Sequence, residues 1–322
     1  MDNLQSLMSV QSVSYNTGRM QLFIENSLKL KGLAYTKDQY GNIYVKKGEA
    51  ELYPTMVCHI DTVHDINDNM EVHISGDNMF AIDRVTMERL GIGGDDKVGI
   101  WITLQMLEEY KNFKAVFFLD EEVGCVGSSK ADFDFFNDST IVLECDRRGN
   151  NDFVNDISGT VMYGEELQAV LNPILTEFGY KETYGGLTDV LKIAQNNDVC
   201  CANMSCGYYD PHSDNEYISI SDVYNTMEMC MEIFDATFDK RYTIDRKVIK
   251  TYSHYQHYYD GYYDHYYDDK VIPNDEVIAE IDRATTCPKC SQEQLYFDHW
   301  DNIHYCLECE YESKTIENEE YK

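Results

Sequence analysis

The sequence predicts an α/β fold: a three-layer sandwich with a mostly parallel central sheet, followed by a small zinc ribbon. Three observations support this prediction. Short apolar runs of strand length alternate with longer runs at helical spacing. The alternation stops at about residue 239, where the composition changes abruptly. Two Cys-x2-Cys pairs follow near the end of the chain, spaced as in a zinc-binding ribbon.

The first third of the chain is expected to form a helix and then strands. From Asn3 to Lys31 apolar residues recur at helical spacing, and Gly32 suits the end of a helix. A turn at Gly41-Asn42 separates two short β-type runs. The next expected elements are a strand over 55–60, a hairpin over 75–78, a buried helix over 97–107 and a strand over 115–119.

The same alternation continues to about residue 239. The expected elements are a strand over 140–143, an amphipathic helix over 165–178, a strand over 199–205 and a long helix over 221–238. Strands interleaved with helices are typical of a largely parallel sheet with helices on its faces. We therefore expect one large domain over residues 1–239.

The segment over 240–283 differs from everything before it. From Tyr252 to Asp269 it is mostly Tyr, Asp and His, without aliphatic side chains to fill a core, which favours a linker or a surface segment. Its tyrosine spacing also suits a helix that stacks its rings on a partner, and both alternatives stay open.

A small metal-binding module is expected over 284–322, where a zinc ribbon precedes an acidic tail. The spacing C-x2-C-x15-C-x2-C is a specific signature of one structural zinc held by four thiolates, from Cys287, Cys290, Cys306 and Cys309. Many ribbons bind nucleic acid, but this one carries 3 Lys against 9 Asp/Glu. That balance favours contact with a protein partner over contact with phosphates.

The overall charge excludes some classes of function. Lys+Arg number 26 and Asp+Glu 58, a formal net charge of −32, which opposes non-specific binding to nucleic acid and to anionic membranes. No stretch approaches the ~18 apolar residues of a membrane span, and Met1 to Val10 does not resemble a secretion signal. We therefore expect a soluble, cytoplasmic protein whose 11 cysteines are thiols or metal ligands.

Five short segments place metal-ligand side chains after predicted strands or in the loops between elements, where α/β folds build their sites. Hydrolysis by two divalent cations needs a bridging carboxylate, further carboxylates and imidazoles, and a free carboxylate that accepts a proton from water. Single acidic pairs are usually only solvated, so the set counts more than any member. The segments are His59-Ile60-Asp61, Gly94-Asp95-Asp96-Lys97, Asp120-Glu121-Glu122, Glu144-Cys145-Asp146 and Asp210-Pro211-His212.

In their order and wording these segments resemble the co-catalytic zinc peptidase superfamily, which includes peptidase T, the carboxypeptidase G and acetylornithine deacetylase group, and the single-domain aminopeptidases. The resemblance runs from the first helix to about Phe238. It implies that residues 1–239 form a phosphorylase/hydrolase-like zinc peptidase domain. It also implies two metal spheres, one of His59, Asp95 and Asp146 and one of Asp95, Glu122 and His212.

The resemblance further implies that neighbouring carboxylates have different roles. Asp61 orients His59, and a cis peptide follows Asp95, which bridges the metals. Glu121 is the general base that takes a proton from the metal-bridged water as this water attacks a carbonyl. Zinc is the expected metal at both positions, with cobalt and manganese as alternatives.

The chain departs from two branches of this superfamily. Asp146 and His212 are 66 positions apart (212 − 146), too few for the lid domain of peptidase T. His59 and Asp95 are 36 apart (95 − 59), too few for the inserted domain of the branch that forms large shells. The expected catalytic domain therefore lacks a lid, and its outline is closest to the single-domain aminopeptidases.

Substrate-binding residues are harder to assign. Arg147 and Arg148 follow a ligand and offer paired donors to a substrate carboxylate, although they could merely offset local negative charge. Thr188 and Asp189 match a loop that faces the metals in the family, where they would contact the amino end of a substrate.

Two functions remain for the whole chain. The leading hypothesis is a metal-dependent hydrolase that cleaves an amide or peptide bond of a small peptide or acyl-amino acid. The alternative is a non-catalytic adaptor in which the hydrolase scaffold, the ribbon and the Tyr-rich segment bind a protein or nucleic-acid partner.

Overall fold

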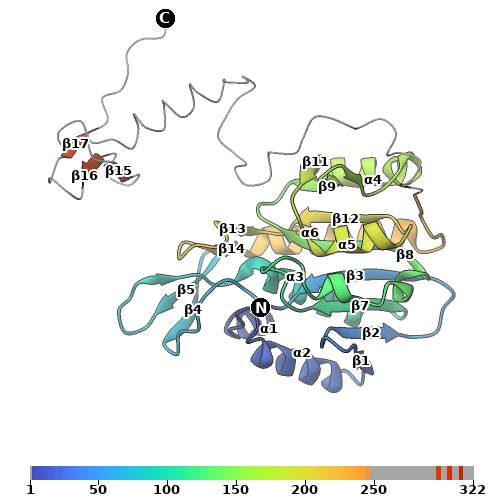
Figure 1. The fold of residues 1–322 in the computed structure, drawn as a ribbon, viewed down its shortest axis with the longest axis horizontal. Helices are drawn as coiled ribbons and strands as arrows, with labels where there is room; N and C mark the ends of the chain where they lie inside the picture. The colour runs from blue at the N-terminus through green and yellow to red at the C-terminus, as the bar shows by residue number, and fades with distance from the viewer. Residues whose placement is uncertain (1, 245, 247–294, 299–302, 307–311, 315–322) are drawn as a thin grey trace, which may run out of the picture. The chain divides into compact units, whose positions relative to one another are not determined.

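The computed structural model describes residues 2–244, 246, 295–298, 303–306 and 312–314 (Figure 1). The chain divides into two units, residues 1–261 and 262–322, and each is described by itself. Most of the predicted linker over 240–283 lies outside the described residues, as do Cys287, Cys290 and Cys309.

The first unit is built on a central sheet whose middle strands run parallel. Within the described residues this sheet has nine strands in the order β1-β2-β7-β3-β8-β12-β9-β10, with β11 also paired to β9. The pairs β7-β3, β3-β8 and β8-β12 are parallel, whereas the pairs towards both edges, apart from β9-β11, are antiparallel. The bounds are β1 Tyr35–Lys37, β2 Ile43–Lys47, β3 Tyr53–His59, β7 Phe113–Phe118, β8 Ser139–Arg147, β9 Asp152–Ile157, β10 Thr160–Val161, β11 Lys181–Gly185 and β12 Cys201–Ser205.

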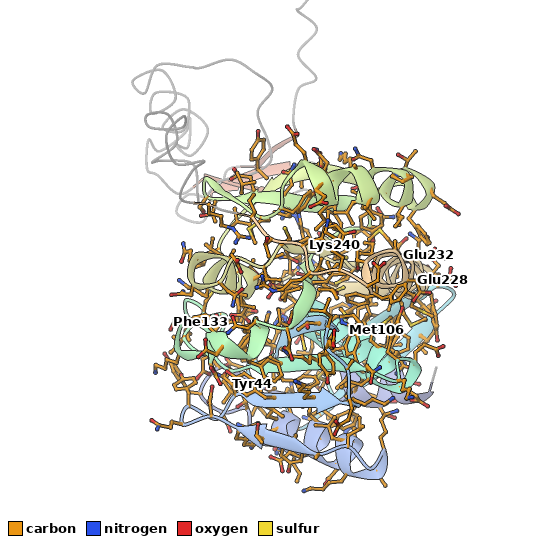
Figure 2. The ribbon with its side chains drawn as sticks, turned by 90° about the vertical axis from the view of Figure 1, so that its right-hand side faces the viewer. Tyr44, Met106, Phe133, Glu228, Glu232 and Lys240 are labelled. Atoms are coloured by element: carbon orange, nitrogen blue, oxygen red, sulfur yellow. The ribbon has the colours of Figure 1, made fainter. Side chains whose placement is uncertain are left out.

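Helices cover both faces of this sheet. Every residue of β3 and of β7 is buried, as expected for central parallel strands covered on both sides. Figure 2 shows Met106 of α3 and Glu228 of α6 on one side and Phe133 of a 3₁₀-helix on the other. Contacts place α4 beside α6, and α5 beside both 3₁₀-helices. The helices are α3 Gly94–Glu109, α4 Glu165–Phe178, α5 Asp189–Asn196 and α6 Ile220–Thr237, with 3₁₀-helices Ser128–Lys130 and Phe133–Phe136. The predicted α/β class and mostly parallel central sheet are confirmed.

A second, smaller sheet is formed by the interval between His59 and Asp95 together with strands near His212. Its order is β13-β14-β5-β4, with β6 paired to β5. The predicted hairpin over 75–78 is the turn between β4 and β5. The strands are β4 Met70–Ser75, β5 Asn78–Asp83, β6 Arg89–Leu90, β13 Tyr208–Tyr209 and β14 Tyr217–Ser219.

The expected helix between Asn3 and Lys31 is interrupted, and this correction bears on the site. The structure has α1 over Asp2–Met8 and α2 over Gly18–Leu30. The segment between them pairs with the chain after β3: the Thr62 amide donates to the Ser12 carbonyl at 2.7 Å, and the Ser12 hydroxyl donates to the Ile60 carbonyl. These tertiary hydrogen bonds satisfy backbone groups that a continuous helix would have paired internally.

Several short elements were not predicted from the sequence. Strand β11 is mostly exposed or half-buried, so it shows no apolar pattern. Helix α5 has eight residues, too few to establish a helical period, and it begins directly after the Gly185–Thr188 loop.

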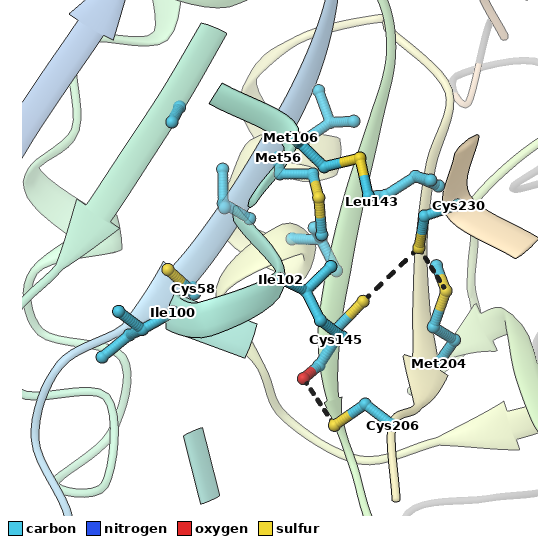
Figure 3. Close-up of a cluster of buried hydrophobic side chains, with 14 of the residues drawn as sticks. Met56, Cys58, Ile100, Ile102, Met106, Leu143, Cys145, Met204, Cys206 and Cys230 are labelled. Carbon is cyan, nitrogen blue, oxygen red and sulfur yellow. Dashed lines mark hydrogen bonds between the residues drawn. The ribbon is translucent and has the colours of Figure 1, made fainter. Parts of the chain in front are cut away.

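The core that α3 and α6 form with the central strands is rich in sulfur (Figure 3). All seven cysteines in the described part of the first unit are free and buried. The Cys145 and Cys230 sulfurs lie 3.7 Å apart, and Cys230 Sγ lies 3.6 Å from Met204 Sδ. Cys58 and Cys145, which flank ligand candidates, thus act as small apolar side chains.

The chain just beyond α6 stays attached to the first unit. The Tyr242 amide donates to the Thr140 carbonyl at 2.9 Å. The guanidinium of Arg246 donates to four backbone carbonyls, among them those of Val161 and Val199. A chain cut at residue 239 would lose these contacts.

The second unit contributes three short strands to the described residues. They are β15 Leu295–Asp298, β16 Ile303–Cys306 and β17 Glu312–Lys314, which form an antiparallel sheet in that order. Cys306 is the last residue of β16. The four-cysteine ribbon itself stays a prediction.

Candidate metal centre

Parallel strands bring the predicted site together at one edge of the central sheet. His59 is the last residue of β3, Asp146 lies near the end of β8, and Glu121 follows β7 closely. Because these three strands run parallel, their carboxyl ends share one edge. Asp95, at the start of α3, and His212, in the loop after β13, complete the set.

Asp95 lies between two imidazoles. Its Oδ1 is 3.0 Å from Nε2 of His59, and its Oδ2 is 3.4 Å from Nε2 of His212. A cis peptide bond joins Asp95 to Asp96, as the resemblance implies. A carboxylate that presents one oxygen to each of two imidazoles has the geometry to bridge two metal ions.

Two further carboxylates flank this arrangement. Glu122 Oε2 is 3.1 Å from Nε2 of His212, and Asp146 Oδ1 is 3.5 Å from Nε2 of His59. The second oxygen of Glu122, Oε1, is buried without a hydrogen-bond partner. The structure thus brings the five predicted ligands together in two groups that share Asp95.

Asp96 also lies close to His59 and Asp146, with ligand atoms of all three residues within 4.8 Å of one another. Its oxygens are already engaged, however. One accepts from the His59 amide at 3.2 Å and the other from the Gly99 amide at 3.1 Å. Asp96 therefore fixes the backbone around the site.

Asp61 stabilises the backbone of the neighbouring loop as well as His59. The nearest acceptor for Nδ1 of His59 is the Asp61 carbonyl oxygen at 2.9 Å, while the Asp61 carboxylate is 3.6 Å away. That carboxylate accepts from the Ser14 hydroxyl at 2.7 Å and from the amides of Glu121 and Glu122. Burial raises the pKa of Asp61, but the hydrogen bonds from His59, Ser14 and the loop prevail and lower it.

The carboxylate of Glu121 has a strongly raised pKa. Burial is the main cause, and the charges of Asp146, Asp189 and Glu122 add to it, whereas His59 opposes it. Together they raise the pKa of Glu121 to about 9. Divalent cations beside this carboxylate would favour its ionised form again.

The imidazoles of His59 and His212 both have raised pKa values. Hydrogen bonds to Asp95 and Glu122 raise the pKa of His212 to about 10. Burial lowers the pKa of His59, but Asp146, Asp61 and Asp95 outweigh it and raise the value. Each imidazole is therefore surrounded by negative charge that a divalent cation would neutralise, and the donor types suit zinc, cobalt or manganese.

Glu216 holds the two ligand loops together, and sequence reasoning missed it. Its buried carboxylate accepts from the Gly93 amide at 2.6 Å and from the Asp95 amide at 3.1 Å, and lies 2.7 Å from Nε2 of His64. The available signal was its position four residues after His212, in Asp-Asn-Glu-Tyr.

Asp120 and Tyr40 support the Glu121 loop, and sequence reasoning missed this role of both residues. Asp120 has a left-handed backbone, with φ 59°, and both of its carboxylate oxygens are bound. Oδ1 accepts from the Tyr15 amide at 2.7 Å and Oδ2 from the Tyr40 hydroxyl at 2.6 Å. These bonds fix the turn from which Glu121 projects.

The predicted substrate-binding residues lie in different surroundings. The Thr188 hydroxyl lies 2.9 Å from Asp146 Oδ2 and 2.7 Å from the buried carboxylate of Glu144. Asp189 is fully buried and its carboxylate oxygens have no hydrogen-bond partner. Arg147 is instead paired with Asp152 at 2.9 Å.

Arg148 follows at the end of β8, and its side chain is exposed. The two arginines therefore differ: one is engaged by a carboxylate of the chain, whereas the other is free of such a pair among the described residues.

Comparison with known proteins decides the family. The sequence pattern of the M42 glutamyl aminopeptidases matches residues 9–229, which span every ligand candidate of the dinuclear centre and Glu121. The chain belongs to the M42 glutamyl aminopeptidase family. It is therefore a metallopeptidase. Within the superfamily that the motifs indicated, the chain is assigned to the M42 family. The comparison with curated protein sequences gives no match.

Solved structures agree with the M42 fold. Aminopeptidase PepT from Bacillus cereus superposes with a TM-score of 0.61 at 14% identity, covering 74% of this chain and 98% of that one. A tripeptidase from Staphylococcus aureus gives 0.58 at 13%, covering 72% and 96%. An aminopeptidase from the archaeon Desulfurococcus kamchatkensis gives 0.55 at 15%, covering 75% and 94%. At these identities the likeness concerns the fold.

M42 peptidases are dinuclear metal enzymes, and the donor set of this chain fits that requirement. Asp95 presents one oxygen to each imidazole, and a buried oxygen of Glu122 lacks a partner. Among the described residues, no helix is long and apolar enough to cross a bilayer.

Proposed function

We propose that this M42 chain is a dinuclear aminopeptidase that hydrolyses a peptide bond of small peptides with a free amino terminus. The position of Asp95 between His59 and His212 is the observation that carries the proposal, because a shared carboxylate is needed only where two ions lie side by side. His59, Asp95 and Asp146 would hold one ion, and Asp95, Glu122 and His212 the other. The bound ions would activate water and polarise the scissile carbonyl.

The chain's own residues handle the proton. Glu121 is next to a ligand but is not itself within either group, so its carboxylate is free to accept the proton of the attacking water and pass it to the leaving amine. Asp61 fixes the Glu121 amide at 3.0 Å, and Asp120 fixes the preceding turn. These contacts orient the base before substrate arrives.

The residues around the metal centre favour a substrate with a free amino terminus. Thr188 contacts Asp146, and the adjoining Asp189 carboxylate is buried without a hydrogen-bond partner. The negative charge gathered beside Asp146 would favour an incoming ammonium group, which the net charge of −32 also attracts. The names of the M42 family and of the solved neighbours support the same choice.

Replacing the proposed base tests the mechanism. In the zinc-loaded full chain, we expect Glu121→Gln to lower turnover of leucyl-p-nitroanilide and Leu-Gly-Gly by about 10²–10⁴-fold, since the amide cannot accept a proton. Elemental analysis should find the metal content unchanged, because Glu121 is not a ligand. Glu228→Gln, on the exposed side of α6 (Figure 2), is the matched control. Unchanged turnover would remove Glu121 from the mechanism, and loss of metal would make it a ligand instead.

A further inference from the structure

The Glu121 carboxylate has one hydrogen-bond donor within the described part of the chain, the thiol of Cys125. The Cys125 sulfur lies 3.2 Å from Glu121 Oε1, within the range of a hydrogen bond from sulfur. We infer that Cys125 is a positioning residue for Glu121: its S–H binds one carboxylate oxygen and leaves the other to take the proton from water. This inference rests on the proposed role of Glu121.

The loop between the two residues is held rigidly in the shape that this contact needs. The amides of Gly124 and Cys125 both donate to the Glu121 carbonyl, at 2.8 and 2.7 Å, and the Val126 amide donates to the Asp120 carbonyl at 3.0 Å. Cys125 has a left-handed backbone, with φ 55°, a conformation that side chains other than Asn and Asp rarely adopt. The strained turn directs the sulfur back to the residue four positions earlier.

The thiol stays protonated and is therefore available as a donor. Cys125 is fully buried. Burial, together with the charges of Asp189 and Glu121, raises the pKa of the Cys125 thiol far above its usual range. A thiolate at this position would also repel the carboxylate, so only the S–H form is compatible with the observed contact.

A weak donor suits a general base. A hydroxyl or ammonium group would bind the carboxylate more strongly and make it a poorer proton acceptor, whereas S–H donates weakly. The simpler interpretation is that Cys125 only fills space as a small apolar residue. Alanine and serine separate the two interpretations, because alanine keeps the small apolar character and serine keeps the donor.

The test uses the zinc-loaded full chain and leucyl-p-nitroanilide. We expect Cys125→Ala to lower kcat about tenfold with KM within about twofold, since a lost hydrogen bond in the transition state affects kcat. Cys125→Ser should retain kcat within about threefold of the parent chain. Cys200→Ala is the matched control, because it removes another buried thiol that has no contact with Glu121. Metal content should be equal in all variants.

Combining variants separates this inference from the proposed function. In a Glu121→Gln background, Cys125→Ala should leave the residual turnover unchanged, because the group that it positions is already gone. An unchanged kcat in Cys125→Ala, with Glu121→Gln inactive, would overturn the positioning role alone. Equal losses in Cys125→Ala and Cys125→Ser, with lowered melting temperatures, would also overturn it. An active Glu121→Gln variant would overturn the proposed function itself.

Discussion

The Glu216 carboxylate accepts a hydrogen bond from the backbone amide of Asp95 at 3.1 Å, so the proposed bridging ligand is held by a residue from the His212 loop. The same carboxylate accepts from the Gly93 amide and lies 2.7 Å from His64. One buried side chain therefore sets the separation of two ligand loops that are distant in sequence. Such outer contacts orient metal ligands and influence metal affinity strongly.

Glu216→Gln tests this relationship. The amide keeps the size of the side chain but loses the charge and replaces one acceptor by a donor, which opposes the Gly93 or Asp95 amide. We expect zinc affinity to fall about 10–100-fold in a competition titration with a chelator. Glu228→Gln, which changes an exposed carboxylate on α6, should have no effect. Unaltered zinc affinity in Glu216→Gln would show that the loops are fixed by other contacts.

The hydroxyl of Tyr40 gives a second prediction, for turnover. Tyr40→Phe removes the donor to Asp120 Oδ2, beside Glu121, and should lower kcat several-fold and the unfolding free energy by about 1 kcal/mol. Tyr35→Phe removes a hydroxyl that is 2.7 Å from Glu25, away from the site, and serves as control. Steady-state kinetics and urea unfolding measure the two effects. Equal kinetic effects of both variants would contradict the role given to Asp120.

The two arginines after Asp146 lead to a prediction about which residue binds a substrate carboxylate. Arg147 is paired with Asp152, whereas Arg148 is exposed. We expect Arg147→Ala to change KM equally for Leu-Gly-Gly and for its C-terminal amide, since its guanidinium is already engaged. Arg148→Ala should raise KM for the free peptide more than for the amide, because its unpaired guanidinium can bind the C-terminal carboxylate. The opposite pattern would assign the carboxylate to Arg147.

Lys114 makes a prediction about stability and pH. It is buried on β7, with its ammonium near the Phe135 carbonyl and Asp138, and 4.1 Å from the centre of the Phe135 ring. Burial outweighs the bond to Asp138 and lowers the pKa of Lys114 to about 8. In the unfolded chain the value is about 10.5. Between these values the unfolded chain binds more protons, so this group makes the unfolding free energy rise with pH.

The comparison variant is Lys114→Met. From pH 8 to 10.5 the free energy of unfolding of the parent chain should increase relative to that of the variant, by about 1–3 kcal/mol. Urea unfolding at several pH values measures the difference. A constant difference across this range would mean that Lys114 has an ordinary pKa in the folded chain.

Metal content tests the dinuclear centre and the predicted ribbon together. The zinc-loaded full chain should bind about three ions, two at the Asp95 centre and one at the four cysteines near the C-terminus. Changing Cys287 and Cys290 to Ser should remove about one ion and leave turnover of leucyl-p-nitroanilide unchanged. Loss of two ions, or of turnover, would contradict the separation of the two sites.

The sequence by itself determined the fold class, because strand-length and helix-length apolar runs are local patterns, and it proposed a ligand set through the resemblance of five short segments to a known superfamily. Strand-length apolar runs specify β3 and β7, and a ligand or the base lies at or just after the end of each. The cis bond after Asp95 and the helix over 165–178 also match the expectation.

Only the tertiary structure decided how these residues are held. The break between α1 and α2, the pairing of Arg147 with Asp152, and the contacts of Glu216, Tyr40 and Cys125 join chain segments that meet in space. No periodic pattern in the sequence indicates such contacts, because each depends on a turn geometry or on a partner far away in the sequence. Spacing and resemblance could therefore propose the ligands, whereas the residues that hold them in place could be identified only from the tertiary structure.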